Sequence, residues 1–446
     1  MENAPSRPTA AVETLGCKVN QYETSYLMEM LDQAGYVIVP FRARADVYVV
    51  HGCAVTAKAG FQTRQLLRRA HRANPDALVV AAGCYAQLDA DRIARERLAT
   101  HILGNPAKFD LASWLRLPGT FDAPCRATES AGRACTEFEI LPVSRMHTGR
   151  TRAMLKIQDG CNSFCSYCVV PYVRGRSRSL PRRLVLEQMD RLVAAGYGEI
   201  VLTGIHLGQW GKDLSPADSL HGLLEAADCA VHPPRVRLSS LEPMELDAAL
   251  LDAVASYSWI CPHLHVPLQS GDAQILERMG RPYTPQRYAE LIARISEAVP
   301  RAAIGADVLT GFPGESDEQF RNTLGFIERL PLAYLHVFPF SPRPGTAAAA
   351  FRGRIQGGEL KERARLLQEL GRCKKREFRE KFVGESLDVL VETRLASGAW
   401  EGLSDNYINV VVRAETELSA GTILPVRIAG FEDDALEGEP ASGFRT

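Results

Sequence analysis

The sequence predicts an α/β protein with a parallel α/β domain at its start, a central partial (β/α)6 barrel and a small all-β barrel at its end. Its 446 residues are about three times the usual size of one domain. Short apolar runs alternate with amphipathic stretches over most of the chain, and β-rich runs separated by Gly, Ser, Asp and Asn follow near its end. We therefore expect a first domain over residues 9–118, a linker over 119–146, a central domain over 147–378 and a last domain over 379–446.

The first domain shows the alternation of strands and helices that is typical of a mostly parallel sheet. Residues 118–148 instead mix Gly, Pro, Ser and scattered charges without periodicity, which favours an inter-domain connection. Before this connection we expect strands at Ala11–Leu15, Val47–Val50 and Leu78–Ala81 and helices at Gln21–Gln33 and Lys58–Arg72.

Six strand candidates separated by helical patterns suggest that the central domain is an open, partial version of a parallel barrel. In such sheets ligands bind beyond the carboxyl ends of the strands, so we expect the chemistry in the loops that follow them. The expected strands are Ala153–Ile157, Ile200–Thr203, Val236–Ser239, Leu264–Leu268, Ile304–Leu309 and Leu335–Phe340. A basic helix at Glu359–Lys381 then precedes β runs at Leu387–Glu392, Tyr407–Val412 and Ile423–Ile428, which suit a small all-β barrel.

Composition and charge exclude several classes of protein. Hydrophobic residues make up 46% and charged residues 24%, as in ordinary globular proteins, which excludes a disordered or fibrous chain. No apolar run is long enough for a membrane span, and the start lacks a secretion signal, so we expect a cytoplasmic protein with no membrane partner. Because the net charge is only -1, a nucleic-acid partner would have to meet a local basic patch.

Eleven cysteines in a chain expected in a reducing compartment point to metal ligation or chemistry rather than to disulfides. Cys161, Cys165 and Cys168 form the run CNSFCSYC just after an expected strand. Three thiolates at this spacing can hold three irons of a [4Fe–4S] cluster and leave the fourth iron open to a substrate. A zinc site is the alternative, but zinc prefers four ligands, and no fourth Cys or His lies nearby in the sequence.

A second cysteine pattern lies in the first domain. Cys17, Cys53 and Cys84 each follow a Gly, and each Gly-Cys pair closes an apolar strand candidate. Parallel strands bring such ends to one edge of the sheet, and Gly allows the sharp turn that points a thiol inward. The alternative is a set of small buried packing residues, but the repetition favours a second cluster. The other cysteines share no such spacing and are assigned to packing or loops: Cys125, Cys135, Cys229, Cys261 and Cys373.

The run QDGCNSFCSYCVVPYVRGRSRS resembles the signature of the radical S-adenosylmethionine enzymes, specifically of their methylthiotransferase branch, and the resemblance covers nearly the whole chain. It implies two [4Fe–4S] clusters and S-adenosylmethionine as cofactors. In this family the open iron of the CxxxCxxC cluster chelates S-adenosylmethionine, and an electron cleaves it to methionine and a 5′-deoxyadenosyl radical. Tyr167 matches the family's aromatic residue beside the adenine. The three N-terminal cysteines match the ligands of an auxiliary cluster that carries the sulfur to be inserted.

The exits of the central strands are Gly-rich and polar, as a cofactor lying across a barrel mouth requires. An ordinary turn-forming role is the alternative for each such residue. His265 and His336 alternate with apolar residues, so we expect core histidines rather than ligands. The resemblance makes five residues candidates to contact the cofactor or order its pocket: Thr203, Gly204, Ser239, Gln269 and Asp307.

A basic run beside the CxxxCxxC motif favours an RNA partner, because phosphate contacts supply most of the sequence-independent affinity. A solvated charged face is the alternative. The run holds nine basic residues against one acidic residue, Asp159: Arg145, Arg150, Arg152, Lys156, Arg174, Arg176, Arg178, Arg182 and Arg183. Lys374, Lys375, Arg376, Arg379 and Lys381 extend it towards the terminal segment. That segment, with GLSDNYINVVV and ILPVRI, resembles the TRAM domain, a small RNA-binding β barrel; Trp400 and Tyr407 could stack on bases, although core packing is favoured.

The stretch GCKVNQYET is similar to the subgroup that acts on N6-threonylcarbamoyladenosine at position 37 of tRNA, in the anticodon loop. The isopentenyladenosine subgroup tends to read GCQMN, and the ribosomal-protein aspartate subgroup tends to read GCPKN. One departure is HGCAVT, where the family usually has NTC; Cys53 is retained, and His51 as an additional ligand is a hypothesis.

The resemblance therefore implies a tRNA methylthiotransferase that replaces the C2 hydrogen of this adenine with a methylthio group. One S-adenosylmethionine would supply the methyl group and a second the radical, with electrons from a donor such as flavodoxin or ferredoxin. Methylthiolation of isopentenyladenosine or of a ribosomal-protein aspartate is the alternative activity. A non-enzymatic iron–sulfur protein that binds RNA or carries electrons is the alternative of another class.

Overall fold

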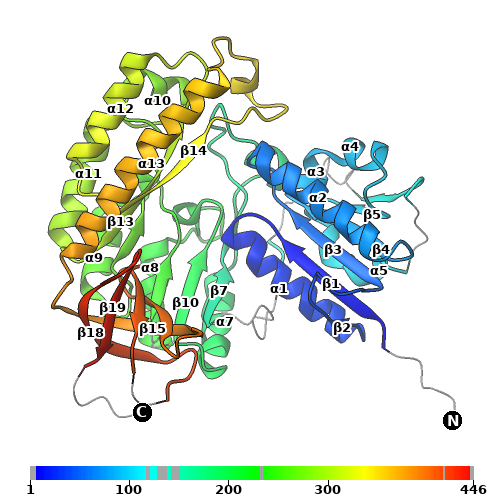
Figure 1. The fold of residues 1–446 in the computed structure, drawn as a ribbon, viewed down its shortest axis with the longest axis horizontal. Helices are drawn as coiled ribbons and strands as arrows, with labels where there is room; N and C mark the ends of the chain where they lie inside the picture. Colours follow the sequence, from blue (N-terminus) through cyan, green and yellow to red (C-terminus); the bar gives the residue numbers. More distant parts are fainter. Residues whose placement is uncertain are drawn as a thin grey trace. The chain divides into compact units, whose positions relative to one another are not determined.

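The computed structural model describes residues 7–116, 121–127, 138–141, 151–231, 233, 235–414 and 417–441. The chain divides into two compact units (Figure 1). The first unit draws on residues 1–148, 158–179 and 341–349, and the second on residues 149–157, 180–340 and 350–446. The segment 158–179, which we call the cysteine loop, contains the CxxxCxxC motif and so shares a unit with the N-terminal cysteines. Among the described residues, no helix has both the length and the apolar character needed to cross a membrane.

A six-stranded parallel sheet forms the centre of the first unit. Its strand order is β2-β1-β3-β4-β5-β6. The three predicted strands are confirmed, whereas the short strands β2, β5 and β6, of two or three residues each, were not predicted. The strands are β1 (Thr9–Thr14), β2 (Val37–Ile38), β3 (Val47–Gly52), β4 (Leu78–Gly83), β5 (His101–Leu103) and β6 (Cys125–Ala127).

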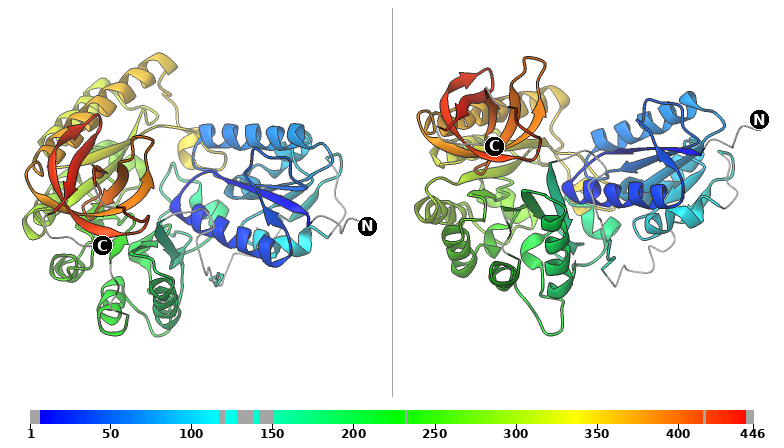
Figure 2. Two further views of the ribbon diagram at one scale, coloured as in Figure 1. Left: turned by 60° about the horizontal axis from the view of Figure 1, so that its bottom comes forward. Right: turned by 90° about the horizontal axis from the view of Figure 1, so that it is seen from below.

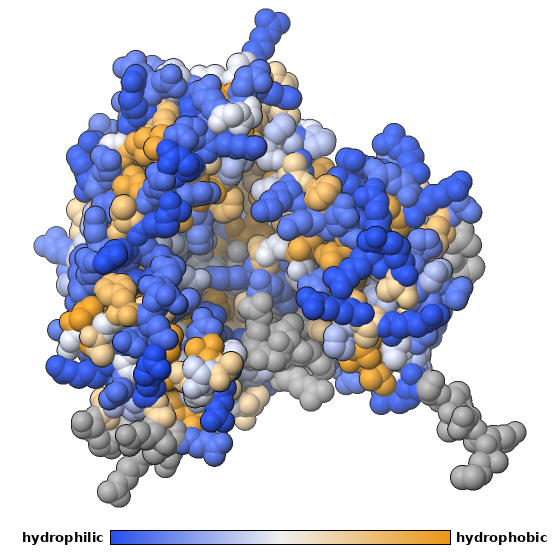
Figure 3. Space-filling view, in the orientation of Figure 1, coloured by the Kyte–Doolittle hydropathy of each residue, from blue (hydrophilic) through white to orange (hydrophobic). Residues whose placement is uncertain are grey.

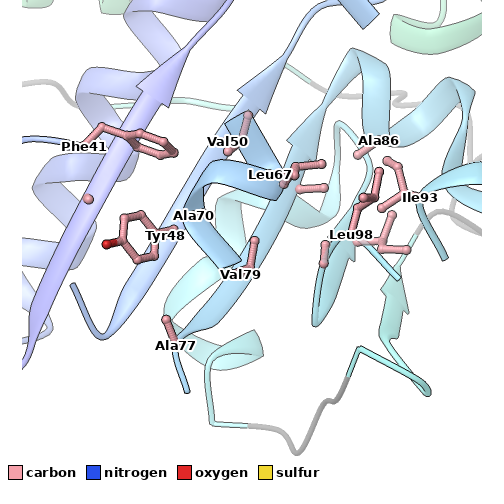
Figure 4. Packing of buried hydrophobic residues seen from close by; sticks show 14 of the residues in the cluster. Phe41, Tyr48, Val50, Leu67, Ala70, Ala77, Val79, Ala86, Ile93 and Leu98 are labelled. Carbon is pink, nitrogen blue, oxygen red and sulfur yellow. The ribbon is translucent and has the colours of Figure 1, made fainter. Parts of the chain in front are cut away.

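Helices cover this sheet through apolar faces that follow the helical period. In helix α2 the side chain of Thr56 accepts a hydrogen bond from the amide of Ala59 and caps the first turn. Leu67 and Ala70 of α2 pack against Tyr48 and Val79 of the sheet (Figure 4). The helices of this domain are α1 (Lys18–Gln33), α2 (Ala57–Ala73), α3 (Cys84–Leu88), α4 (Ala90–Arg95) and α5 (Leu111–Trp114), with a 3-10 turn at Ala107–Asp110. The cysteine loop adds β8 (Gln158–Asp159), α6 (Val170–Arg174) and β9 (Arg178–Ser179).

The second unit contains the predicted partial barrel. Each of the six predicted strands overlaps an observed strand, although β12 ends at His265 and not at the predicted Leu268. The strands form two parallel three-stranded groups, β11-β10-β7 and β12-β13-β14, and a parallel bridge between Val236 and Ile260 continues from β11 towards β12. The strands are β7 (Arg152–Lys156), β10 (Glu199–Thr203), β11 (Val236–Leu238), β12 (His263–His265), β13 (Ala303–Thr310) and β14 (Tyr334–Pro339). The helices are α7 (Arg182–Ala194), α8 (Leu220–Ala230), α9 (Ala248–Ser256), α10 (Ala273–Met279), α11 (Pro285–Ala298), α12 (Asp317–Arg329) and α13 (Gly357–Glu380).

A closed barrel of five strands ends the second unit (Figure 2). The sequence predicted three of these strands and missed β16 and β19, whose Gly and charged residues hide the alternation of an ordinary strand. Leu387, Val389 and Val391 point into the barrel core, while Asp388 between them is exposed. The strands are β15 (Ser386–Arg394), β16 (Trp400–Ser404), β17 (Asn409–Val412), β18 (Ile423–Glu432) and β19 (Ala435–Pro440).

Buried arginines join this closed barrel to the partial barrel within the second unit. Arg235 and Arg237 both bind the carboxylate of Glu199, at 2.6 and 2.8 Å. Arg237 also donates to the backbone carbonyls of Ser404 and Asp405 at 3.1 and 2.8 Å. These bonds satisfy a buried guanidinium and fix the last domain against the strands beside it.

Tyr407 packs inside the second unit, as the sequence favoured. Its ring stacks on His263 with a centroid distance of 4.2 Å, and the guanidinium carbon of Arg237 lies 5.3 Å from its centroid. Trp400 is half-buried and packs against the core of the closed barrel.

Candidate functional site

The N-terminal cysteines lie at the carboxyl ends of three neighbouring strands of the first sheet. Cys17 precedes helix α1, Cys53 follows β3, and Cys84 is the first residue of α3 directly after β4. In the parallel register Thr14 of β1 pairs with His51, and Gly52 pairs with Gly83. The three strands therefore end at the same level, and the Gly-Cys pattern does predict this convergence.

Gly16 allows the turn at Cys17 to pack closely against Cys53. Its φ of +115° lies in the region that favours glycine. A Cβ added to Gly16 would lie 2.7 Å from the Cβ and 3.0 Å from the Sγ of Cys53. The third cysteine, Cys84, is buried like Cys53, whereas Cys17 is exposed.

The three thiols also influence one another electrostatically. Burial raises the pKa of Cys53 to about 12, and the neighbouring Cys84 and Cys17 act in the same direction. Although Cys17 as a residue is exposed, burial around its thiol raises the pKa of Cys17, with Arg174 acting in the opposite direction and Cys84 adding to the increase. Cys17 and Cys53 therefore ionise with difficulty on their own, but a bound metal stabilises the thiolate form. This donor set of three converging sulfurs fits a [4Fe–4S] cluster with one open iron.

A buried polar network lies beside these cysteines, and His51 is the one residue of it that the sequence analysis had singled out. The Lys108 ammonium donates to the Glu23 carboxylate and to the Asn105 amide oxygen, both at 2.7 Å. The Nδ1 of His51 lies 2.9 Å from the Thr24 hydroxyl, and its Nε2 lies 3.5 Å from Glu23. Burial and the charge of Lys108 hold the pKa of His51 well below its usual range. Because both ring nitrogens face these partners, the structure argues against His51 as a cluster ligand.

The cysteine loop is held in a defined fold. Gly160 has a φ of +73°, and a Cβ there would lie 1.9 Å from the carbonyl oxygen of Arg176. The amide of Cys161 donates to the carbonyl of Gly175 at 3.1 Å, and that of Cys168 donates to the carbonyl of Cys165 at 2.9 Å. Backbone contacts thus fix both ends of the motif, which suits three sulfurs that must share one cluster.

Between the loop cysteines, Tyr167 is half-buried. The sequence did not single out Phe164 and Tyr172, two exposed aromatic side chains of the same loop that pack edge to face at 5.9 Å. The remaining described cysteines, Cys125, Cys229, Cys261 and Cys373, form no disulfide. Cys135 lies outside the described residues.

Four of the five strand-exit candidates lie where the sequence predicted. Thr203 ends β10 and Gly204 follows it, while Ser239 follows β11. Gln269 lies beyond β12 with a φ of +66°, and its backbone bonds to Asp307 and Leu309 of β13. These residues border the carboxyl ends of the barrel strands, where a ligand is expected.

The fifth candidate, Asp307, lies within β13 rather than at its end. Its Oδ1 lies 2.9 Å from Nε2 of His265 and 3.3 Å from Nδ1 of His336. Burial raises the pKa of Asp307, but both histidines outweigh this effect and hold it below the usual range. Asp307 therefore orders two imidazoles in this structure.

The expectation of two core histidines is correct for His265 and wrong for His336. His265 is buried, and its Nδ1 lies 3.0 Å from the hydroxyl of Tyr334. His336 is half exposed, because β14 lies at the end of its strand group and leaves this side chain uncovered. The donor atoms of His265, Asp307 and His336 all lie within 4.8 Å of one another, a spacing that could hold a metal ion.

The structure buries three residues of the basic run that was predicted to face RNA. Lys156, Arg174 and Arg178 are buried, and the two arginines pair with Asp159. Charges can be buried when they are paired, and a sequence does not reveal such partners. Three other residues of the run are exposed: Arg176, Arg182 and Arg183. Arg152 is half-buried, and Arg145 and Arg150 lie outside the described residues.

The second basic set is divided in the same way. Lys374 and Arg379 are buried, the former bonded to carbonyls of Glu328 and Leu330 and the latter to Asp434. Lys375 also pairs with Asp434, whereas Arg376 and Lys381 are exposed. The face of the molecule in Figure 3 is mostly hydrophilic, with scattered apolar patches.

Two family models match this chain. The uncharacterized protein family UPF0004 matches residues 9–104, and the Radical SAM superfamily matches residues 155–327. Among solved structures, a radical S-adenosylmethionine methyltransferase, TsrM from Kitasatospora setae, gives a TM-score of 0.54 at 17% identity. The match covers 77% of this chain and 75% of TsrM, and at this identity it shows a shared fold.

Curated relatives resemble the chain over nearly its whole length. The chain is 38% identical to the threonylcarbamoyladenosine tRNA methylthiotransferase MtaB of Aquifex aeolicus (strain VF5), over 90% of this chain and 95% of the relative. It is 36% identical to MtaB of Bacillus subtilis (strain 168), with 95% and 94% covered. The tRNA-2-methylthio-N(6)-dimethylallyladenosine synthase of Erythrobacter litoralis (strain HTCC2594) is 30% identical, with 98% of each chain covered.

Fold, family models and relatives agree with one another. The cofactors of this family are [4Fe–4S] clusters and S-adenosylmethionine, and the relatives named above act on tRNA. The chain belongs to the radical S-adenosylmethionine methylthiotransferases that act on threonylcarbamoyladenosine in tRNA.

Proposed function

We propose that Cys17, Cys53 and Cys84 hold the sulfur-donating cluster and that Cys161, Cys165 and Cys168 hold the cluster that activates S-adenosylmethionine. The reaction is methylthiolation at C2 of N6-threonylcarbamoyladenosine, at position 37 in the anticodon loop. What supports this assignment is that the two cysteine sets occupy one compact unit, and that the N-terminal thiols converge at one sheet edge.

When bound, the clusters and S-adenosylmethionine supply the sulfur, the methyl group and the radical that an unactivated aromatic C–H requires. The chain's own contribution is ligation and positioning. The turn at Gly16 brings Cys17 beside Cys53. At the start of the cysteine loop, the close packing of Gly160 against the backbone of Arg176 orients the second cysteine set. Tyr167, Thr203, Gly204, Ser239 and Gln269 are our candidates for the S-adenosylmethionine pocket, and Asp307 orders the histidines beside it.

The closed barrel at residues 386–440 is our candidate for a TRAM-type RNA-binding domain. Two observations support this: the barrel has five strands, and the exposed basic residues Arg376 and Lys381 precede its first strand in the chain. A tRNA substrate favours a cytoplasmic enzyme, and an electron donor such as flavodoxin or ferredoxin would reduce the cluster.

Mass analysis of tRNA nucleosides tests the proposed substrate. Cells that lack this chain should lose the 2-methylthio form of threonylcarbamoyladenosine, and the chain supplied from a plasmid should restore it. Loss of methylthio-isopentenyladenosine instead, or a loss of mass from a ribosomal protein, would assign the alternative activities. No change in any of these products would favour a non-enzymatic iron–sulfur protein.

A further inference from the structure

Arg174 is a buried cation whose contacts come from two separate parts of the first unit. It is the last residue of α6, and only 2% of its side chain is exposed. Its guanidinium donates to Asn20 Oδ1 at 2.6 Å, to both oxygens of Glu23 at 3.1 Å, and to Asp159 Oδ1 at 2.9 Å. Asn20 and Glu23 belong to α1, whereas Asp159 belongs to the cysteine loop.

Each of these partners lies close to a candidate cluster ligand. Asn20 lies three residues after Cys17 in helix α1, and its Oδ1 is 3.7 Å from the Cys17 thiol. Asp159 is separated from Cys161 only by Gly160. The guanidinium therefore links the start of α1 at the first cysteine set to the start of the second set.

The residue before Arg174 makes a parallel connection to Cys84. The side-chain amide of Asn105 donates to the carbonyl of Val173 at 2.7 Å and to the sulfur of Cys84 at 3.5 Å. Val169 and Val173 also share a small apolar cluster with Ala54 and Cys84. Helix α6 is thus fixed beside two of the three N-terminal cysteines by its last two residues.

The electrostatic effect of Arg174 on this site is favourable for anionic sulfur. Burial would lower the pKa of Arg174, but Cys84, Glu23 and Asp159 outweigh it and raise that pKa, so the group stays charged. A buried ion pair is weak evidence for stability alone, since apolar residues can often replace it without loss.

We propose that Arg174 is a positioning residue of the sulfur-donating centre, supplying a fixed positive charge beside Cys17 and Cys84 and holding the cysteine loop to α1. The inference rests on the proposed function, in which these cysteines hold a [4Fe–4S] cluster. Charge and hydrogen bonding around the sulfurs set the potential of such a cluster. Loss of the cation should make its one-electron reduction more difficult.

The test uses the full chain with Cys161, Cys165 and Cys168 all changed to Ala, so that only the N-terminal cluster remains. The midpoint potential of this cluster is measured by dye-mediated titration with dithionite, and its iron content is measured in parallel. We expect Arg174→Gln to shift the potential to a more negative value and to speed the loss of iron to a chelator. Arg174→Lys, which keeps the charge, should restore most of the potential.

Arg44→Gln is the matched control. Arg44 is 70% exposed and binds Asn74 near the amino ends of the strands of the same sheet, away from the cysteines at their carboxyl ends, so its loss should leave the potential unchanged. An unchanged potential in Arg174→Gln, or equal potentials in Arg174→Gln and Arg174→Lys, would overturn the inference. Full iron content after a further Cys53→Ala change would instead overturn the proposed function, and the inference with it.

Discussion

Glu199 shows most clearly how a single residue depends on its surroundings. Burial raises its pKa, but Arg237 and Arg235 outweigh this and lower the pKa from 4.5 to about 2. A carboxylate with a depressed pKa stabilises the folded state above its unfolded pKa, and this stabilisation is lost as the pH falls. This difference in the pKa of Glu199 corresponds to a stabilisation of the folded state on the order of 3 kcal/mol.

We expect Glu199→Gln to lower the free energy of unfolding at pH 7, because two buried arginines lose their counter-charge. The gap between the variant and the native chain should narrow as the pH falls from about 4.5 towards 2, where Glu199 itself becomes protonated. Denaturant unfolding of both proteins across this range is the measurement. A gap that stays constant with pH would contradict the assigned cause.

The sequence predicted the positions of individual charged residues poorly, because it does not show which of them are buried and paired. The cysteine patterns could be predicted, because Gly-Cys at strand ends and CxxxCxxC are local in the chain. Glu23, Lys108 and Arg174 come together only through tertiary contacts. Their charges look the same in the sequence as those of exposed residues, so Arg174 was assigned to an RNA-facing surface that it does not reach.

At the scale of elements, the turn between β1 and α1 decides whether the first cysteine set can form. We expect Gly16→Ala to lower cluster content several-fold, because the added methyl would overlap Cys53 in a backbone conformation that already disfavours alanine. Iron and sulfide analysis of the reconstituted protein is the measurement.

Gly35→Ala is the matched control for this turn. Gly35 also has a positive φ, of +93°, but nothing lies within 4 Å of an added Cβ. The control should lose some stability, of about 1 kcal/mol, and keep its clusters. Equal loss of iron in both variants would show that backbone strain, and not contact with Cys53, is responsible.

Strands of five or more residues with apolar side chains were predictable, as β3, β4, β10 and β13 show. Those that escaped prediction are short, as β5 and β6 are, or carry Gly and charge, as β16 and β19 do. In these strands neighbouring strands and barrel closure, rather than local pattern, determine the conformation.

At the scale of the whole molecule, the closed barrel and the partial barrel are parts of one unit. We expect Arg237→Leu to increase cleavage between residues 381 and 385 in limited proteolysis, because the carbonyls of Ser404 and Asp405 lose their donor. Arg427→Ala, at an exposed position of the same barrel, is the control. Equal cleavage rates in the two variants would mean that Arg237 does not hold the barrel in place.

The central proposal is that the two cysteine sets hold clusters with different roles, one donating sulfur and the other activating S-adenosylmethionine. Native protein reconstituted without oxygen should bind about eight irons per chain, as two [4Fe–4S] clusters require. Cys165→Ala should then form no 5′-deoxyadenosine from S-adenosylmethionine.

The most direct measurement is the nucleoside product of Cys53→Ala with threonylcarbamoyladenosine-containing tRNA, S-adenosylmethionine and a reductant. We predict that this variant still forms 5′-deoxyadenosine but gives no methylthio nucleoside, because its sulfur-donating site has lost a ligand. Methylthio nucleoside formed by Cys53→Ala at the native rate would contradict the claim.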